Sequence, residues 1–165
     1  MLHYTTHLST PDAEWVTFIH GAGGSSGIWF KQIRAFQKHF NVLLIDLRGH
    51  GKSKKPIYEQ LKHYQFDNIG DEVIEVLNHL HIKNTHWVGI SLGTIVIREI
   101  TERFPERTLT MIMGGAIMKL NLRGQVLMRL GSMLKSVVPY LVLYRFFAHI
   151  IMPKKSHRES RNLFI

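Results

Sequence analysis

The residues NVLLIDL, at positions 41–47, form an almost uninterrupted apolar run that stops at an aspartate. A run of this length without polar alternation is typical of a strand that is covered on both faces in a parallel sheet. Other apolar, β-rich runs, with the sequences WVTFIH, THWVGI and LTMIMGGA, occupy residues 15–20, 85–90 and 109–116. The chain is therefore expected to be built around a sheet with at least one strand buried on both sides.

Helical patterns separate these apolar runs. Apolar residues recur along one helical face in residues 28–40 and in residues 67–80, and a third helix is expected over residues 92–104. Strands that alternate with amphipathic helices favour an α/β fold, with a parallel sheet and helices on both of its faces. In such folds, ligands and catalytic groups gather at the carboxyl ends of the strands. Two glycine-rich turns, at residues 21–27 and 89–93, occupy that position.

Composition limits the chemistry and divides the chain. Of the 165 residues, 45% are apolar, which fits a folded globular chain. The chain has no cysteine, so disulfides and thiolate metal sites are excluded, and neither a metal nor a cofactor is predicted. Residues 1–118 hold 12 Lys and Arg against 11 Asp and Glu, whereas residues 119–165 hold 9 against a single glutamate. This contrast predicts a core module over residues 1–118 and a basic segment over residues 119–165.

Two phosphate-binding motifs compete to explain the glycine-rich turns. GHGKS ends like a P-loop, but a P-loop needs a glycine five residues before Gly51, where Asp46 stands. GAGGSS comes close to the dinucleotide-binding pattern G-x-G-x-x-G, and Asp46 stands about where a ribose-binding acid belongs. However, Ser26 replaces the third glycine, and this pattern explains neither His20 nor the turn at residues 89–93. A Rossmann-type dinucleotide-binding protein is kept as an alternative.

The turn Gly89-Ile90-Ser91-Leu92-Gly93 has the pattern G-x-S-x-G between an expected strand and an expected helix. This is the context of a nucleophile elbow, in which a serine occupies a strained backbone and small residues on either side avoid collisions. The N-terminus of the following helix favours negative charge that develops near Ser91. The pattern predicts that Ser91 is a nucleophile and that Gly89 and Gly93 are the small residues of the elbow.

Three motifs, FIHGAGGSSGIW, LLIDLRGHGKS and WVGISLGT, follow one another in the order and spacing of the α/β-hydrolase superfamily. Residues 15–116 resemble, more narrowly, its small cap-bearing esterase-like and C–C hydrolase-like members. The resemblance implies an α/β-hydrolase fold and acyl transfer from a small ester or related acyl substrate to water, through an acyl-serine intermediate. Epoxide hydrolases and haloalkane dehalogenases of the superfamily carry aspartate at the nucleophile position, so Ser91 also favours acyl transfer.

The resemblance implies roles for further residues, motif by motif. The stretch HGA at residues 20–22 is similar to the oxyanion loop of the family, so the backbone amides of Ala22 and Leu92 are expected to bind the oxyanion of the tetrahedral intermediate. The residues that match positions bracing the site are His20, Gly21, Asp46, Arg48 and His50.

A serine nucleophile needs a base and an orienting acid, and in this superfamily the chain order is Ser, then Asp or Glu, then His. The acids and histidines that follow Ser91 are Glu99, Glu102, Glu106, Glu159, His149 and His157. The first three acids belong to the expected helix or its end, and neither histidine follows an expected strand. The sequence therefore predicts the N-terminal portion of a hydrolase without its catalytic acid and histidine, and hence a chain that is inactive alone.

Three explanations for these missing residues stay open. The chain is a fragment of a longer protein, which we favour, or a second chain supplies a complementing C-terminal half. In the third explanation, the protein has kept the fold but is a non-catalytic binding protein.

The basic C-terminal segment is predicted to be an incomplete helical cap. Its longest uncharged stretch, residues 136–144, is far shorter than the roughly 20 residues that span a bilayer. A basic amphipathic surface for anionic lipid, over residues 119–152, is the alternative, and no motif indicates nucleic-acid binding. No signal peptide is recognisable at the N-terminus, which predicts a cytoplasmic protein. An open sheet edge would favour self-association.

Overall fold

The computed structural model describes residues 1–53, residues 66–116 and a few single positions between 122 and 146. The chain divides into two compact units, Met1–Ile117 and Met118–Ile165. Most of the predicted cap segment lies outside the described residues, so its assignment as a cap stays a prediction. Within the described part of the chain, no helix has the length and apolar character needed to cross a bilayer.

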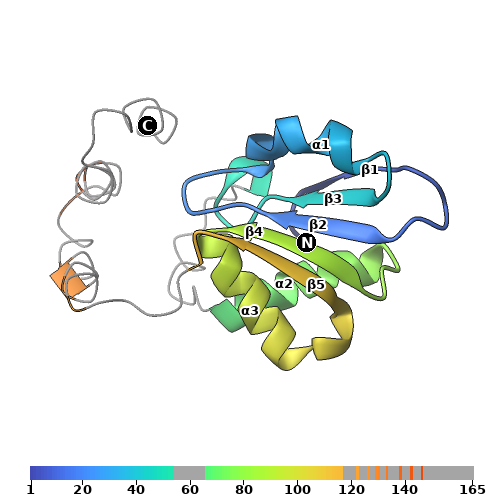
Figure 1. Ribbon diagram of the computed structural model, residues 1–165. Helices are drawn as coiled ribbons and strands as arrows, with labels where there is room; N and C mark the ends of the chain where they lie inside the picture. Colours follow the sequence, from blue (N-terminus) through green and yellow to red (C-terminus); the bar gives the residue numbers. More distant parts are fainter. Residues whose placement is uncertain are drawn as a thin grey trace. The chain divides into compact units, whose positions relative to one another are not determined.

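A five-stranded sheet forms the centre of the first unit (Figure 1). Its strands are β1 (Tyr4–His7), β2 (Trp15–Ile19), β3 (Asn41–Ile45), β4 (Thr85–Ile90) and β5 (Thr108–Gly114). They lie in the order β1-β3-β2-β4-β5, and all neighbours are parallel except β1, which is antiparallel to β3. Every residue of β3 is buried. Residues 41–45 of the apolar run are thus a strand covered on both faces, as the sequence predicts.

Helices cover both faces of this sheet (Figure 1). On one face, α1 (Phe30–Phe36) contributes Ile33 and Phe36 to a core around Phe18 of β2. On the other face, α2 (Phe66–His79) and α3 (Leu92–Arg103) pack against a larger core that includes the fully buried Trp87 of β4. This arrangement confirms the predicted α/β class, with a mostly parallel sheet between helices.

The structure differs from the sequence prediction in one helix and adds one strand. The helix expected over residues 28–40 consists of a 3-10 helix, Ser26–Trp29, followed by α1, which ends at Phe36. After Phe36 the backbone forms a turn, in which the amides of His39 and Phe40 both donate to the carbonyl of Phe36 (3.0 and 2.9 Å). β1 was not predicted, because its sequence YTTH carries no apolar pattern and becomes a strand through its pairing with buried β3.

Candidate active site

Ser91 lies between the end of β4 and the first residue of α3. Its φ of 51° falls in the left-handed region, where a non-glycine residue is strained. Hydrogen bonds on both sides fix this backbone. The Ser91 amide donates to the carbonyl of Gly114 in β5 (2.9 Å), and the amide and hydroxyl of Thr94 both donate to the Ser91 carbonyl (2.9 and 2.6 Å). The strained turn therefore sits at the carboxyl end of β4, as the sequence indicates.

Gly89 and Gly93 flank this turn, and neither position has room for a side chain. A Cβ atom at Gly93 would meet the carbonyl oxygen of Ile19 and would lie 2.9 Å from that of His20. A Cβ atom at Gly89 would meet the side chain of Ile97 and would lie 3.0 Å from the carbonyl carbon of Gly93. These close approaches arise because β4 pairs with β2, so that α3 begins directly against the end of β2.

The loop after β2 touches the serine turn. A Cβ atom at Gly21 would lie 3.3 Å from both the carbonyl oxygen of Ile90 and the Cβ of Ser91. The loop itself is tight, since the amide of Gly24 donates to the Gly21 carbonyl (3.1 Å) across Gly23, which has a φ of 73°. The structure thus brings together the two glycine-rich turns that are 70 or so residues apart in sequence.

The two residues predicted to offer oxyanion-binding amides flank this contact. Ala22 follows Gly21 and is exposed, and Leu92 is the first residue of α3 and is half-buried. Within residues 1–53 and 66–116, no side chain forms a hydrogen bond with the Ser91 hydroxyl. The described residues therefore place the serine and the loop together without a base for the serine.

His20 is fully buried, and both of its ring nitrogens are occupied. Nε2 accepts a hydrogen bond from the amide of Leu47 (3.0 Å), so Nδ1 carries the proton and donates to the carbonyl of Gly21 (2.7 Å). Burial lowers the pKa of His20, although the bond to Gly21 opposes this shift. His20 is thus a neutral link between the end of β3 and the loop at Gly21, and neither nitrogen is free to take a proton from Ser91.

A His20→Gln variant is expected to show a weaker loss of stability in mild acid than the wild type. Protonation of His20 would place an N–H against the amide of Leu47. Since the pKa of His20 is lowered in the folded state, the wild type loses free energy of unfolding as the pH falls below the unfolded value of about 6.5. Glutamine carries one donor and one acceptor and does not titrate. Urea unfolding at about pH 7.5 and about pH 5.5 measures the difference, and equal losses in both proteins would contradict this role.

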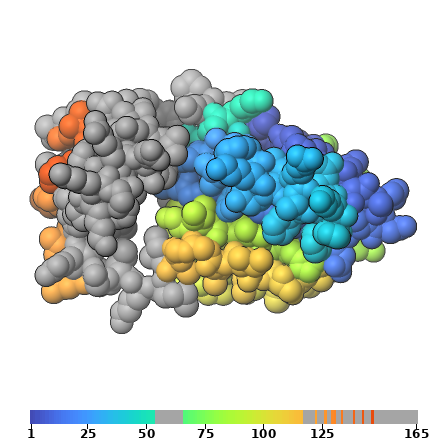
Figure 2. Space-filling view, turned by 45° about the horizontal axis from the view of Figure 1, so that its top comes forward, coloured from blue at the N-terminus to red at the C-terminus, as the bar shows by residue number. Residues whose placement is uncertain are grey.

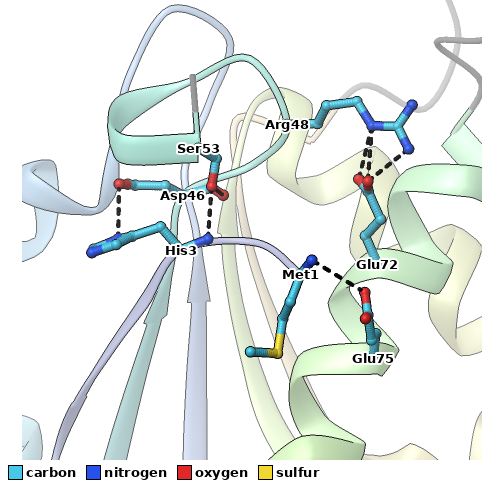
Figure 3. A network of polar contacts seen from close by, with 7 residues as sticks. All are labelled: Met1, His3, Asp46, Arg48, Ser53, Glu72 and Glu75. Carbon is cyan, nitrogen blue, oxygen red and sulfur yellow. Dashed lines mark hydrogen bonds and ion pairs between the residues drawn. The ribbon is translucent and has the colours of Figure 1, made fainter. Parts of the chain in front are cut away.

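Asp46 follows β3 and is buried. Its Oδ1 accepts the amide of Ser26 (2.6 Å), and its Oδ2 accepts the amide of Lys52 (2.9 Å). Burial alone would raise the pKa of Asp46, but these hydrogen bonds outweigh burial and lower it. Figure 3 shows the His3 ring beside the carboxylate, with Nδ1 3.4 Å from Oδ2. The Ser53 hydroxyl accepts the His3 amide (2.8 Å) and donates to the Asp46 carbonyl (2.7 Å).

One carboxylate therefore joins three segments: the residues before β1, the loop after β2 and the loop after β3. A bracing role for this position was inferred from the resemblance, and the hydrogen bonds give that role a physical basis. The role itself stays a prediction.

Arg48 connects the loop after β3 to α2 (Figure 3). Its Nε lies 3.0 Å from both carboxylate oxygens of Glu72, and its Nη2 lies 2.6 Å from Oε1. The two side chains are only 20% and 25% exposed, and such two-pronged guanidinium–carboxylate pairs are the stronger ion pairs in proteins. His50 donates from Nδ1 to the Arg48 carbonyl (2.9 Å), and its ring centre lies 5.1 Å from that of His20.

Sequence reasoning missed several partners of these residues, namely His3, Ser26, Ser53, Glu72 and Thr94. Only Thr94 carried a usable signal, because it lies three residues after Ser91, which directly precedes a helix, and a threonine hydroxyl can bond to the carbonyl three residues back. The others come from segments whose approach depends on the fold.

Comparison with known proteins identifies the family. Residues 14–138 match the alpha/beta hydrolase fold. The chain belongs to this family. Over 106 residues, the hydrolase-fold chain is 34% identical to 3-oxoadipate enol-lactonase 2 from Acinetobacter baylyi, a match that covers 64% of the chain and 38% of that relative. The resemblance carried by the three sequence motifs is thereby confirmed.

Two solved structures are similar to this α/β-hydrolase chain. The enol-lactonase from Burkholderia xenovorans aligns with a TM-score of 0.61 and 27% identity, over 67% of this chain and 41% of that one. A hydrolase from Pseudomonas aeruginosa aligns with a TM-score of 0.74 and 22% identity, over 98% of this chain and 61% of that one. The second likeness shows the shared fold. The chain spans less than two thirds of the length of each of these proteins.

Proposed function

We propose that this chain carries the nucleophile half of a serine hydrolase, which transfers the acyl group of a small ester or lactone to water through an acyl-Ser91 intermediate. The observation that carries this proposal is the strained Ser91 backbone, with a φ of 51°, packed against the loop at Gly21. The similarity to two proteins named enol-lactonase supports an ester-type substrate.

In the proposed reaction, the Ser91 hydroxyl oxygen attacks the substrate carbonyl carbon while a base takes the hydroxyl proton. The carbonyl oxygen becomes an oxyanion that the backbone amides of Ala22 and Leu92 bind, and each such donor contributes about 3 kcal/mol. The oxyanion then collapses and the acyl C–O bond breaks, while the protonated base gives its proton to the alcohol or enol oxygen, which in a lactone stays joined to the acyl chain. The base next takes a proton from water, the water oxygen attacks the acyl-serine, and the carboxylic acid is released as Ser91 regains its proton. His20 acts as a positioning residue, because its bond to the Gly21 carbonyl fixes the peptide that leads into Ala22.

The base and its acid are proposed to lie outside the described residues, either later in a longer chain or on a second chain. Two facts support this. No described side chain bonds to the Ser91 hydroxyl, and the buried His20 has both nitrogens occupied.

The 165-residue chain is expected to hydrolyse p-nitrophenyl acetate scarcely faster than a Ser91→Ala variant. Free imidazole, however, is expected to accept the Ser91 proton in place of the absent base. The Ser91-dependent part of the rate should then rise on the order of tenfold, well below the roughly 10²–10⁴-fold that a positioned base contributes. Initial rates of p-nitrophenol release across a series of imidazole concentrations measure this effect.

Two variants serve as controls for this experiment. Ser91→Ala reports the direct catalysis by imidazole, and Ser9→Ala, in the segment between β1 and β2, should keep the wild-type response. Equal rates for wild type and Ser91→Ala at every imidazole concentration would contradict the nucleophile and favour a binding protein on this fold. Rapid Ser91-dependent turnover without imidazole would instead contradict the external base.

A further inference from the structure

The carbonyl of Ser91 and the amide of Leu92 belong to one peptide unit. Because a trans peptide unit is planar, a partner that holds its carbonyl oxygen also fixes the direction of its N–H, on the opposite side. The hydroxyl and the amide of Thr94 hold the Ser91 oxygen, at 2.6 and 2.9 Å. Leu92 is the first residue of α3, so its own amide has no acceptor within the helix. Thr94 therefore sets the direction of one of the two proposed oxyanion donors.

The backbone angles of Ser91 show what the Thr94 hydroxyl resists. The φ of 51° is combined with a ψ of −115°, whereas a non-glycine residue with positive φ usually has a ψ of roughly +30 to +60°. Rotation of ψ toward that range would swing the Ser91 carbonyl and the Leu92 amide together, since both belong to the rotating peptide unit. The bond from the hydroxyl opposes this rotation, because it would break as the carbonyl moved away.

Thr94 lies in a buried place, where α3 begins against the end of β2. Figure 2 shows the blue region that includes β2 bordering the yellow-green region that contains β4 and the start of α3. Thr94 itself is only 2% exposed, so its hydroxyl is shielded from water. A hydrogen bond in such surroundings is electrostatically stronger than one in water. The bond to the Ser91 carbonyl is thus a firm one.

The other proposed oxyanion donor is held in the same way. The Ala22 amide shares its peptide unit with the Gly21 carbonyl, which accepts Nδ1 of the buried His20 (2.7 Å). In both peptide units, a buried side chain donates to the carbonyl oxygen and the N–H points to the other side. A hydrogen bond at the carbonyl also polarises the peptide unit, which makes its N–H a better donor.

We propose that Thr94 is a positioning residue of the site, which holds the Leu92 amide toward the oxyanion as His20 holds the Ala22 amide. Thr94 does not touch the substrate in this arrangement and acts only through the peptide unit between Ser91 and Leu92. The inference rests on the proposed function, because the oxyanion forms only if Ser91 attacks a carbonyl carbon.

The experiment measures the Ser91-dependent release of p-nitrophenol from p-nitrophenyl acetate by the 165-residue chain, with imidazole as the base. Thr94→Val keeps the volume of the side chain but removes its hydroxyl. Its Ser91-dependent rate should fall about tenfold, which is less than the roughly 10²–10³-fold that the loss of a whole oxyanion donor costs. Thr94→Ser keeps the hydroxyl and loses only a methyl group, so it should keep most of the wild-type rate.

Urea unfolding separates positioning from a general loss of stability. Thr94→Val and Thr94→Ser should both lower the urea midpoint, but only Thr94→Val should lose the rate. Thr17→Val is the matched control, because it removes an equally buried hydroxyl, 2.9 Å from that of Thr85, in the middle of β2. This control should lower the midpoint and leave the Ser91-dependent rate unchanged.

The possible failures are distinguishable. A folded Thr94→Val variant with the wild-type rate would overturn the positioning role and leave the nucleophile in place. So would a Thr94→Ser variant that loses as much of the rate as Thr94→Val, since the hydroxyl would then not be the group that matters. Equal rates for the wild type and Ser91→Ala would instead overturn the proposed function, and this inference with it.

Discussion

A Gly93→Ala variant is expected to lose about 3 kcal/mol or more of its free energy of unfolding. The added methyl group would collide with the carbonyl of Ile19 and lie 2.9 Å from the carbonyl oxygen of His20. Both groups are backbone atoms at the end of β2, which is held between β3 and β4 and cannot move aside without breaking strand pairs. The collision could be avoided only if α3 moved away from β2, which would also displace Ser91. The urea midpoint of the variant measures the loss.

Gly27→Ala is the matched control for this substitution. Gly27 lies in the 3-10 helix before α1, and a Cβ atom there would meet only the Ser25 hydroxyl at 3.4 Å, an ordinary contact. We expect a change within about 0.5 kcal/mol. If Gly93→Ala were as stable as Gly27→Ala, α3 would not begin as close to β2 as described.

Asp46→Asn is expected to cost about 2–3 kcal/mol near neutral pH. An amide group would replace a carboxylate that accepts the amides of Ser26 and Lys52, so one N–H would point at another N–H. The pKa of Asp46 is lowered in the folded state. Its contribution to stability is therefore present above the unfolded value of about 3.9 and is lost as the pH falls through the folded value.

The free energies of unfolding of the wild type and of Asp46→Asn are therefore expected to converge as the pH falls. The wild type should lose stability steeply below about pH 4, and Asp46→Asn should lose less, so the difference between them shrinks in acid. Urea unfolding at about pH 7 and about pH 3.5 tests this expectation. Asp12→Asn, at an exposed position before β2, controls for the removal of one negative charge. Parallel profiles for wild type and Asp46→Asn would show that the Asp46 carboxylate does not stabilise the fold.

The sequence predicted those parts of the fold and the site that are determined by short, contiguous stretches of residues. The buried strand β3 is one example, because the apolar run at residues 41–47 identifies it without reference to neighbouring strands. The turn around Ser91 is another, since its glycines and its place before a helix lie within five residues. Both patterns express local steric requirements, which do not depend on the rest of the chain.

Features that depend on register could not be predicted. Arg48 pairs with Glu72 because α2 packs beside the end of β3, and nothing near either residue in sequence specifies the other. Likewise, Asp46 receives the amide of Ser26 only because β2 and β3 lie side by side and the loop after β2 folds back over them. The α1 prediction was too long because helical periodicity continues past Phe36, where the backbone already turns.

The pairing of β2 with β4 also bears on how the chain folds in time. The buried hydroxyls of Thr17 and Thr85 lie 2.9 Å apart although 68 residues separate them. To pair strands so far apart in sequence, the chain must lose the entropy of closing a long loop before the stabilising contacts form. This makes the pairing an intrinsically slow step in folding. The contact between the Gly21 loop and Ser91 cannot exist until this step is complete. The candidate site should thus be among the last features to mature after synthesis, later than the local pairing of β2 with β3.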